Sequence, residues 1–83
     1  MAKYDPLRDW LRAQTGRSAI TVRFSDIEQL IGGPLPVSAH RHNAWWANEV
    51  GGNHVHAHAW QDAGWCVDAF DQAARWVRFR RVS

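Results

Sequence analysis

The stretch "GGNHVHAHAWQDAGW", residues 51–65, places three histidines at every second position. On a strand these side chains would share one face, whereas on a helix they would be distributed around the axis. The segment "AHAWQDAG" is rich in alanine and lacks the β-branched residues that strands favour. Asn53 is a suitable N-cap and Gly64 a suitable terminator. The sequence therefore predicts a helix over about 53–63.

At about 100° per residue, this helix separates the histidines into two groups. One side is apolar and holds Val55, His56, Ala59, Trp60 and Ala63. His56 is therefore expected to face the core with a hydrogen-bond partner. The other side holds His54, Ala57, His58 and Gln61. His54 and His58 could bind a metal ion only if a loop histidine, His40 or His42, folded over them, so we expect no metal and no other cofactor.

Upstream, the first helix and the first strand have clear signals. Asp5 followed by proline is typical of a helix start and Gly16 of a helix end, which predicts a helix over about 5–15. The segment "SAITVRF", residues 18–24, alternates apolar and polar side chains. This alternation predicts a strand with one buried face.

A second helix is expected to follow that strand directly. Ser25 and Glu28 have the spacing of a capping box, and Gly32 with the glycine and proline after it ends the helix. The segment 34–52 has no clear periodicity. Within it, Ser38 could cap a short helical turn over 40–46.

Downstream of the last helix, two short segments alternate as strands do, with Val67 and Ala69 in the first and Val77 and Phe79 in the second. The predicted order is helix, strand, helix, irregular segment, helix, strand, strand. We interpret this order as a single α+β domain over 1–83 that resembles a winged helix-turn-helix, with the C-terminal hairpin as the wing.

The formal net charge is +2, and nine of the ten Lys and Arg residues are arginine. Four arginines fall within "RWVRFRRVS", residues 75–83, and an acidic partner should be attracted to that end. The single cysteine, Cys66, allows no internal disulfide, which favours a reducing, cytoplasmic location. A DNA-binding protein in that location would lie at the nucleoid. No apolar run approaches the length of a membrane span, so no membrane partner is expected.

These features favour a DNA-binding protein in which the last helix approaches base edges and the wing contacts phosphates. Asn53, His54, His58 and Gln61 are the candidates on the helix. Arg41 and His42 would position the backbone from the central segment. Arg75, Arg78, Arg80 and Arg81 are the candidates on the wing, where Arg81 should face away from Arg78 and Arg80. Monomer and homodimer both stay open.

No catalytic arrangement can be assembled from the serines, the cysteine or the glycine pairs. A small nuclease with His40, His42 or His58 as general base stays open, but we expect no enzyme. The main alternative is a protein-interaction module, such as an adaptor or an antitoxin-like partner, that uses exposed tryptophans. The pair Trp45 and Trp46 distinguishes the two hypotheses. Exposure of this pair in an apolar patch away from the arginines would favour a protein partner, although we expect at least one of the two to be structural. One continuous surface formed by the arginines, His54, His58 and Gln61 would favour nucleic acid.

Several motifs together resemble a family of small bacterial domains of unknown function. They are "YDPLRDWL" (4–11), "FSDIEQLIGGPLP" (24–36), "AWWAN" (44–48), "AGW" (63–65) and a final "VRFRR" (77–81). The resemblance covers about residues 4–81 and implies a compact domain rather than an activity. Members often have basic residues before "AWWAN". This sequence has Arg41 there but Asn43 at an expected basic position, which argues against a phosphate-binding role for Asn43.

Overall fold

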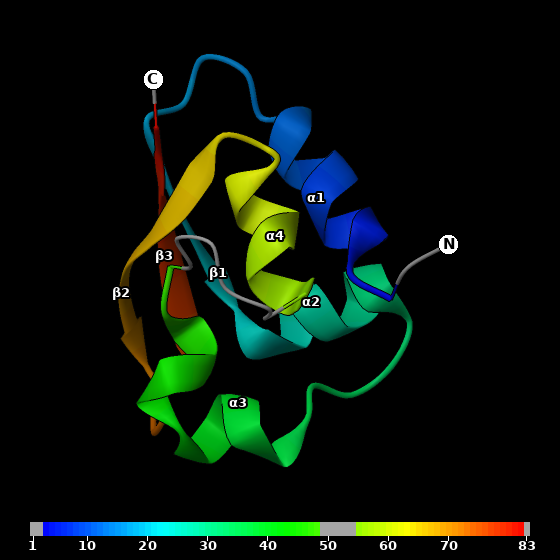
Figure 1. Cartoon of the computed structure of the whole chain (residues 1–83), viewed down its shortest axis with the longest axis vertical. Helices are drawn as coiled ribbons and strands as arrows, with labels where there is room; N and C mark the ends of the chain where they lie inside the picture. The colour runs from blue at the N-terminus through cyan, green and yellow to red at the C-terminus, as the bar shows by residue number, and fades with distance from the viewer. Residues whose placement is uncertain (1–2, 49–54, 83) are drawn as a thin grey trace.

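The computed structural model describes residues 3–48 and 55–82. In this part of the chain, four α-helices and three strands form an α+β domain (Figure 1). The helices are α1 (Asp5–Arg12), α2 (Phe24–Ile31), α3 (Val37–Arg41) and α4 (Val55–Gln61), with a 3₁₀ helix, η1 (Asn43–Trp46), between the last two. The strands are β1 (Ala19–Arg23), β2 (Trp65–Asp71) and β3 (Trp76–Arg81). The α+β class predicted from the sequence is confirmed.

The three strands form an antiparallel sheet in the order β1-β3-β2. Because successive side chains on a strand point to opposite faces, every second residue of β1 and of β3 faces the core. Ile20, Val77 and Phe79 face the helices and are at most 5% exposed, whereas Arg78 and Arg80 face solvent. Helices α1, α2 and α4 lie together on the inner side of the sheet (Figure 1). The outer face of the sheet is thus the solvent face.

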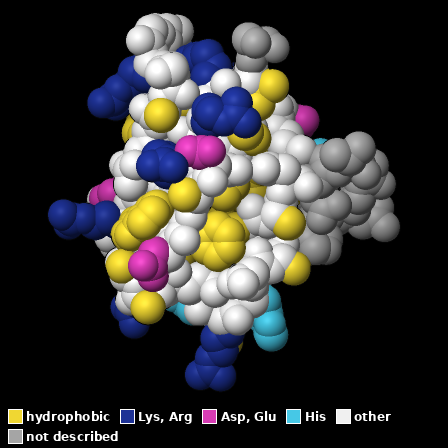
Figure 2. All heavy atoms as spheres, turned by 90° about the vertical axis from the view of Figure 1, so that its left-hand side faces the viewer, with side chains coloured by type: hydrophobic (Ala, Val, Ile, Leu, Met, Phe, Trp, Pro, Cys, Tyr) yellow, Lys and Arg dark blue, Asp and Glu magenta, His cyan; other side chains and the backbone are white. Residues whose placement is uncertain are grey.

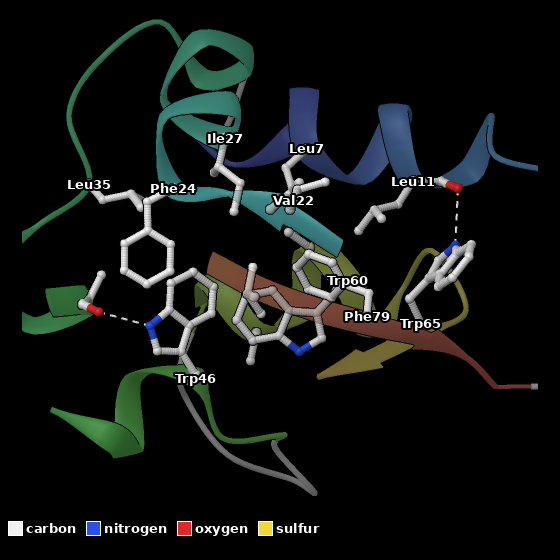
Figure 3. Packing of buried hydrophobic residues seen from close by; sticks show 14 of the residues in the cluster. Leu7, Leu11, Val22, Phe24, Ile27, Leu35, Trp46, Trp60, Trp65 and Phe79 are labelled. Carbon is white, nitrogen blue, oxygen red and sulfur yellow. Dashed lines mark hydrogen bonds between the residues drawn. The ribbon is translucent and has the colours of Figure 1, made fainter. Parts of the chain in front are cut away.

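Large aromatic side chains fill the space between sheet and helices. Trp46, Trp60 and Trp65 are each at most 1% exposed. Trp46 stacks on both Phe24 and Trp60, with ring centroids 5.0 and 5.8 Å apart (Figure 3). The indole N–H of Trp46 donates to a carbonyl oxygen of α3 at 2.8 Å, and that of Trp65 donates to a carbonyl oxygen of α1 at 3.0 Å. These bonds avoid the cost of about 1–3 kcal/mol for a buried donor without a partner.

Trp45 and His56 connect η1 to α4. Their rings stack in parallel with centroids 4.0 Å apart, and Nε2 of His56 lies 2.7 Å from the carbonyl oxygen of Trp45. Tyr4 packs edge-on against both rings, and its burial raises the pKa of its hydroxyl because desolvation disfavours the phenolate. The prediction that His56 faces the core with a hydrogen-bond partner is confirmed, and both Trp45 and Trp46 are buried.

The helix boundaries differ from those predicted. Helix α1 ends at Arg12 instead of about residue 15, because the next amide bonds shift toward the i−3 spacing of a tighter turn. Helix α2 begins at Phe24, and the predicted capping box is wrong. The Asp26 carboxylate accepts the Arg23 backbone N–H at 3.0 Å, whereas the Glu28 carboxylate accepts a backbone N–H of the loop before α3 at 2.8 Å. The strand continues directly into the helix, which moves the cap by two residues.

Two further expectations about the helices are corrected. The short helix of the central segment begins after Pro36, so Ser38 lies inside it and is not its cap. Ala57, which the helical period assigns to the polar side of α4, is completely buried. The reason is that α4 packs against both α1 and β2, so that it buries more than one face.

Candidate functional site

An open hollow lies where the start of α2, helix α3 and the turn between β2 and β3 meet. Its volume is about 530 Å³. We call this surface the basic hollow; it is lined by Arg23, Phe24, Ser25, Glu28, Val37, His40, Arg41, Ala74 and Arg75. Three arginines from three separate elements therefore meet at one concave surface.

Local structure explains how the arginines come together. Arg23 ends β1, Arg41 ends α3, and Arg75 lies in the turn of the β2–β3 hairpin. The backbone N–H of Phe24 donates to the carbonyl oxygen of Arg75 at 2.9 Å, which holds this turn against the start of α2. Within the turn, Asp71 accepts the Arg75 N–H with its carbonyl oxygen at 2.7 Å and the Ala74 N–H with its carboxylate at 2.9 Å.

Arg75 has a backbone φ of 62°, in the left-handed region. For a residue with a Cβ this conformation costs about 1–2 kcal/mol, and glycine or asparagine is the usual occupant. An arginine in this conformation is therefore conformationally costly. The turn places Arg75 in the lining of the same hollow as Arg23 and Arg41.

The hollow has an excess of positive charge. Among the described residues, no salt bridge involves Arg23, Arg41 or Arg75. The single carboxylate in the lining, that of Glu28, is engaged with the backbone of the loop before α3. Three guanidinium groups against one engaged carboxylate attract anions, and guanidinium groups suit phosphate and carboxylate oxygens in particular.

The predicted site residues are thus only partly brought together. Arg41 and Arg75 line the hollow, and so do Arg23 and His40. The sequence reasoning assigned Arg23 to no site and did not place His40 among the DNA-contacting residues. The His40 ring packs edge-on against Phe24, with centroids 5.4 Å apart. The signal for Arg23 was its place at the end of an alternating strand, directly before a helix. That signal identifies an exposed position but not its neighbours.

Arg78 and Arg80 point to the outer face of the sheet, where both bind Asp68. Arg78 Nη2 lies 2.8 Å and Arg80 Nε 3.8 Å from its carboxylate oxygens. Figure 2 shows the molecule from the sheet side, with arginine and lysine, acidic groups and a central hydrophobic area mixed on one face. The one carboxylate of Asp68 therefore compensates half of the positive charge of Arg78 and Arg80. These two arginines do not line the basic hollow.

Arg81 stabilises the fold. Its guanidinium group lies 4.6 Å from the centre of the Trp65 ring and donates to the carbonyl oxygens of Gln14 and, at 3.0 Å, Arg17. It faces away from the exposed side chains of Arg78 and Arg80, as alternation on a strand predicts. These contacts fasten the end of β3 to the loop after α1.

The polar residues of the last helix are placed elsewhere. His58 is exposed, with Nδ1 4.0 Å from the carboxylate four residues later, and Gln61 is half-buried at the end of α4. His42 is exposed between α3 and η1. None of these three lines the basic hollow. The predicted contacts of Asn53 and His54 lie outside the described residues.

The tryptophan side chains expose little surface, and the alternative of a protein-interaction module depends on that exposure. The buried indoles are those of Trp45, Trp46, Trp60 and Trp65. Trp10 and Trp76 are half-buried.

In residues 3–48 and 55–82 there is no helix long and apolar enough to cross a membrane. Within the same ranges, no three His, Cys, Asp or Glu side chains come together as metal ligands would.

The profile of a protein family described as a domain of unknown function, DUF7662, matches residues 4–82. The chain belongs to this family. The match covers nearly the whole chain, and it confirms the resemblance to a family of small domains of unknown function that the sequence motifs indicated. No curated protein and no solved structure matches the chain.

Proposed function

We propose that this domain is a DNA-binding protein of the winged-helix type, not an enzyme, and that the basic hollow contacts the phosphate backbone of double-stranded DNA. The observation that carries the proposal is the convergence of Arg23, Arg41 and Arg75 without salt-bridge partners among the described residues. Guanidinium groups bind phosphate oxygens through two parallel hydrogen bonds. An arginine that is not bound to a carboxylate is free to make such bonds.

The order of the elements supports the winged-helix part of the proposal. Three main helices, α1, α2 and α4, pack on a small sheet that ends in a hairpin. In winged-helix binding the last helix approaches the major groove and the hairpin contacts the backbone. Arg75 lies at the turn of this hairpin, as a backbone contact requires. In the same arrangement, His58 and Gln61 on α4 would approach base edges.

The openness of the hollow favours a polymer over a small anion. Arg23, Ser25, Arg41 and Arg75 are all exposed, and no side chain among the described residues closes over them. Small ligands are usually bound in cavities that bury most of their surface. A phosphate backbone, in contrast, runs across an open surface and contacts several cations at once.

The test is fluorescence-anisotropy titration of random-sequence duplex DNA at several salt concentrations. The wild-type protein should bind at low salt and weaken steeply as salt rises. The triple variant Arg23→Ala, Arg41→Ala, Arg75→Ala should make the slope of log K against log salt less steep by about 2.7, since each phosphate contact contributes about 0.9.

A matched variant controls for charge alone. Arg12→Ala, Arg78→Ala, Arg80→Ala lowers the net charge equally but leaves the hollow intact. It should keep most of the salt dependence. Equal losses in the two triple variants, or no binding by the wild-type protein at low salt, would exclude the proposal. His58→Ala tests base readout in the same assay, because it should change the preference among sequences more than the affinity for random DNA.

A further inference from the structure

We propose that β1 pairs with the β1 strand of a second copy of this chain and forms a homodimer. A three-stranded sheet in the order β1-β3-β2 has two edges, β1 and β2. Pairing of β1 with itself would give one continuous antiparallel sheet with six strands. This proposal does not depend on nucleic-acid binding, because it rests on the backbone of β1 at the edge that faces away from β3 and not on the basic hollow.

The backbone of β1 has hydrogen-bonding groups directed away from β3. The Arg81 N–H donates to the Ser18 carbonyl oxygen at 2.8 Å, and the Phe24 N–H donates to the Arg75 carbonyl oxygen at 2.9 Å. In antiparallel pairs such bonds involve alternate residues, so the even-numbered positions of β1 face β3. The N–H and C=O groups of its odd-numbered positions, with Thr21 in the middle, therefore point to the free edge.

Part of this edge already has a partner. The Arg23 N–H is taken by the Asp26 carboxylate at 3.0 Å. The backbone groups of Ala19 and Thr21 have no hydrogen bond to another element within the described ranges. Unpaired edge groups of this kind are a template for another strand.

The two edges of the sheet differ in the features that normally prevent pairing. Native edge strands are protected by bulges, inserted charges and prolines. β2 has a register shift between Val67 and Ala69, with Asp68 at the irregular position. β1 has a regular register over Ala19–Arg23, contains the strand-forming residues Ile, Thr and Val, and carries its only charge at its last position. β1 is thus the edge on which pairing is favoured.

Space is available on both sides of the β1 edge. One hollow of about 550 Å³ is lined by Thr21, Arg23 and the half-buried Trp76, among others. A second, of about 340 Å³, is lined by Trp10 and residues of α2. Val22 lines both hollows, so the edge lies between them. A neighbouring strand could place side chains against a tryptophan on either face.

The β1 edge is complementary to itself when two copies run antiparallel. Pairing centred on Thr21 aligns the whole strand and brings the two Thr21 side chains together, a favourable cross-strand pair. Arg17 precedes the strand and Asp26 follows it, so each exposed arginine would meet the carboxylate of the other copy. Among the described residues Arg17 has no salt bridge, and the Asp26 carboxylate is bound only to a backbone N–H. This charge complementarity favours a second copy as the occupant.

The first experiment measures the mass of the full chain by sedimentation equilibrium over a range of concentrations, without nucleic acid. The wild-type protein should form dimers. Thr21→Pro removes only an N–H that faces the free edge, and edge strands tolerate proline at such a position. It should raise the dimer dissociation constant by at least about tenfold, whereas Thr21→Val, which keeps the N–H and the branched side chain, should not.

A second pair of variants keeps the test decisive if Thr21→Pro does not fold. In a Cys66→Ser background, Thr21→Cys should form a disulfide between copies, because centred pairing brings these two Cα atoms to about 5.5 Å. Ala19→Cys should not, because four residues of strand separate the two positions by about 14 Å.

The outcomes separate this proposal from the one on DNA. A wild-type protein that stays monomeric at all concentrations would overturn it, as would equal cross-linking of the two cysteine variants. A dimer that persists in Thr21→Pro would place the interface elsewhere and would also overturn it. DNA binding by a purely monomeric protein would leave the function of the basic hollow untouched.

Discussion

Asn48, the last residue of "AWWAN", connects two elements through one side chain. Its Oδ1 accepts the indole N–H of Trp60 at 3.2 Å and the backbone N–H of Val67 at 2.8 Å. Its Nδ2 donates to the Val67 carbonyl oxygen at 3.0 Å. The amide group supplies an acceptor and a donor on two separate atoms. A carboxylate at neutral pH has no donor, and a hydroxyl has only one oxygen for all its bonds. The asparagine therefore ties the segment after η1 to α4 and β2.

Asn48→Ala should lower the free energy of unfolding by about 1–3 kcal/mol, because it leaves the indole N–H of the buried Trp60 without its partner. Urea denaturation followed by tryptophan fluorescence measures the change. Asn43→Ala is the matched control, since Asn43 is exposed and no side-chain hydrogen bond of it is found in the described part of the chain. Similar stabilities of the two variants would show that the Asn48 bonds contribute little.

At this scale the sequence predicted which residues are buried better than it predicted their partners. Composition and spacing indicated that Trp45 or Trp46 is structural and that His56 faces the core. The partner of the Trp65 indole is a carbonyl oxygen 54 positions away, at Leu11. Such a contact depends on how helices and sheet are assembled, and no local pattern in the sequence contains it.

At the scale of the elements, a substitution in the turn of the β2–β3 hairpin tests protein stability and DNA binding separately. Arg75→Asn keeps a residue that accepts the left-handed conformation, and it removes the charge. We expect the free energy of unfolding to stay within about 0.5 kcal/mol of the wild-type value or to rise. The salt slope of DNA binding should become less steep by about 0.9. Chemical denaturation and anisotropy titration of one preparation measure both.

Arg75→Lys is the control for this variant, because it retains the positive charge but not the forked geometry of arginine. It should keep the salt slope and lose part of the affinity. A loss of stability in Arg75→Asn, with binding unchanged, would mean that the arginine serves the turn and not the ligand.

The elements also show where local patterns are insufficient. Periodicity correctly indicated that 53–63 contains a helix, but it assigns one buried face to every amphipathic helix. α4 contacts both α1 and β2, so Ala57 is buried although the period places it on the polar side. In the same way, Ser25 suits an N-cap, but β1 continues directly into α2, so the N-cap is Arg23 and the Asp26 carboxylate accepts its N–H. Tertiary packing, not propensity, fixes these details.

At the scale of the whole molecule, closeness in sequence proved a poor guide to closeness in space. The arginines of 75–81 were predicted to lie together on the wing, with Arg81 facing away from Arg78 and Arg80. The alternation of β3 and the carboxylate of Asp68 separate Arg78 and Arg80 from Arg75. Arg23 and Arg41 reach the same hollow as Arg75 from other elements. The basic hollow therefore depends on how the strands and helices are arranged in space, which no local pattern in the sequence contains.

Together, the two proposals predict how binding depends on DNA length. The domain extends 31 × 26 × 26 Å, so one copy covers about 8 base pairs and a dimer needs about 20 at 3.4 Å each. Arg23 lines the basic hollow and also ends β1, so pairing through β1 places two basic hollows in one particle. A duplex that reaches both should gain affinity through the second contact, by up to about a hundredfold.

This gain is measured by comparing duplexes of about 8 and 24 base pairs, at equal concentration of binding sites, with the wild-type protein and with Thr21→Pro. The wild-type protein should prefer the longer duplex strongly, because the second hollow binds at a high effective concentration once the first is bound. Thr21→Pro should bind the short duplex like the wild-type protein and lose the additional gain on the long one. If both proteins gain equally with length, the longer duplex merely offers more independent sites, and the two hollows do not act together.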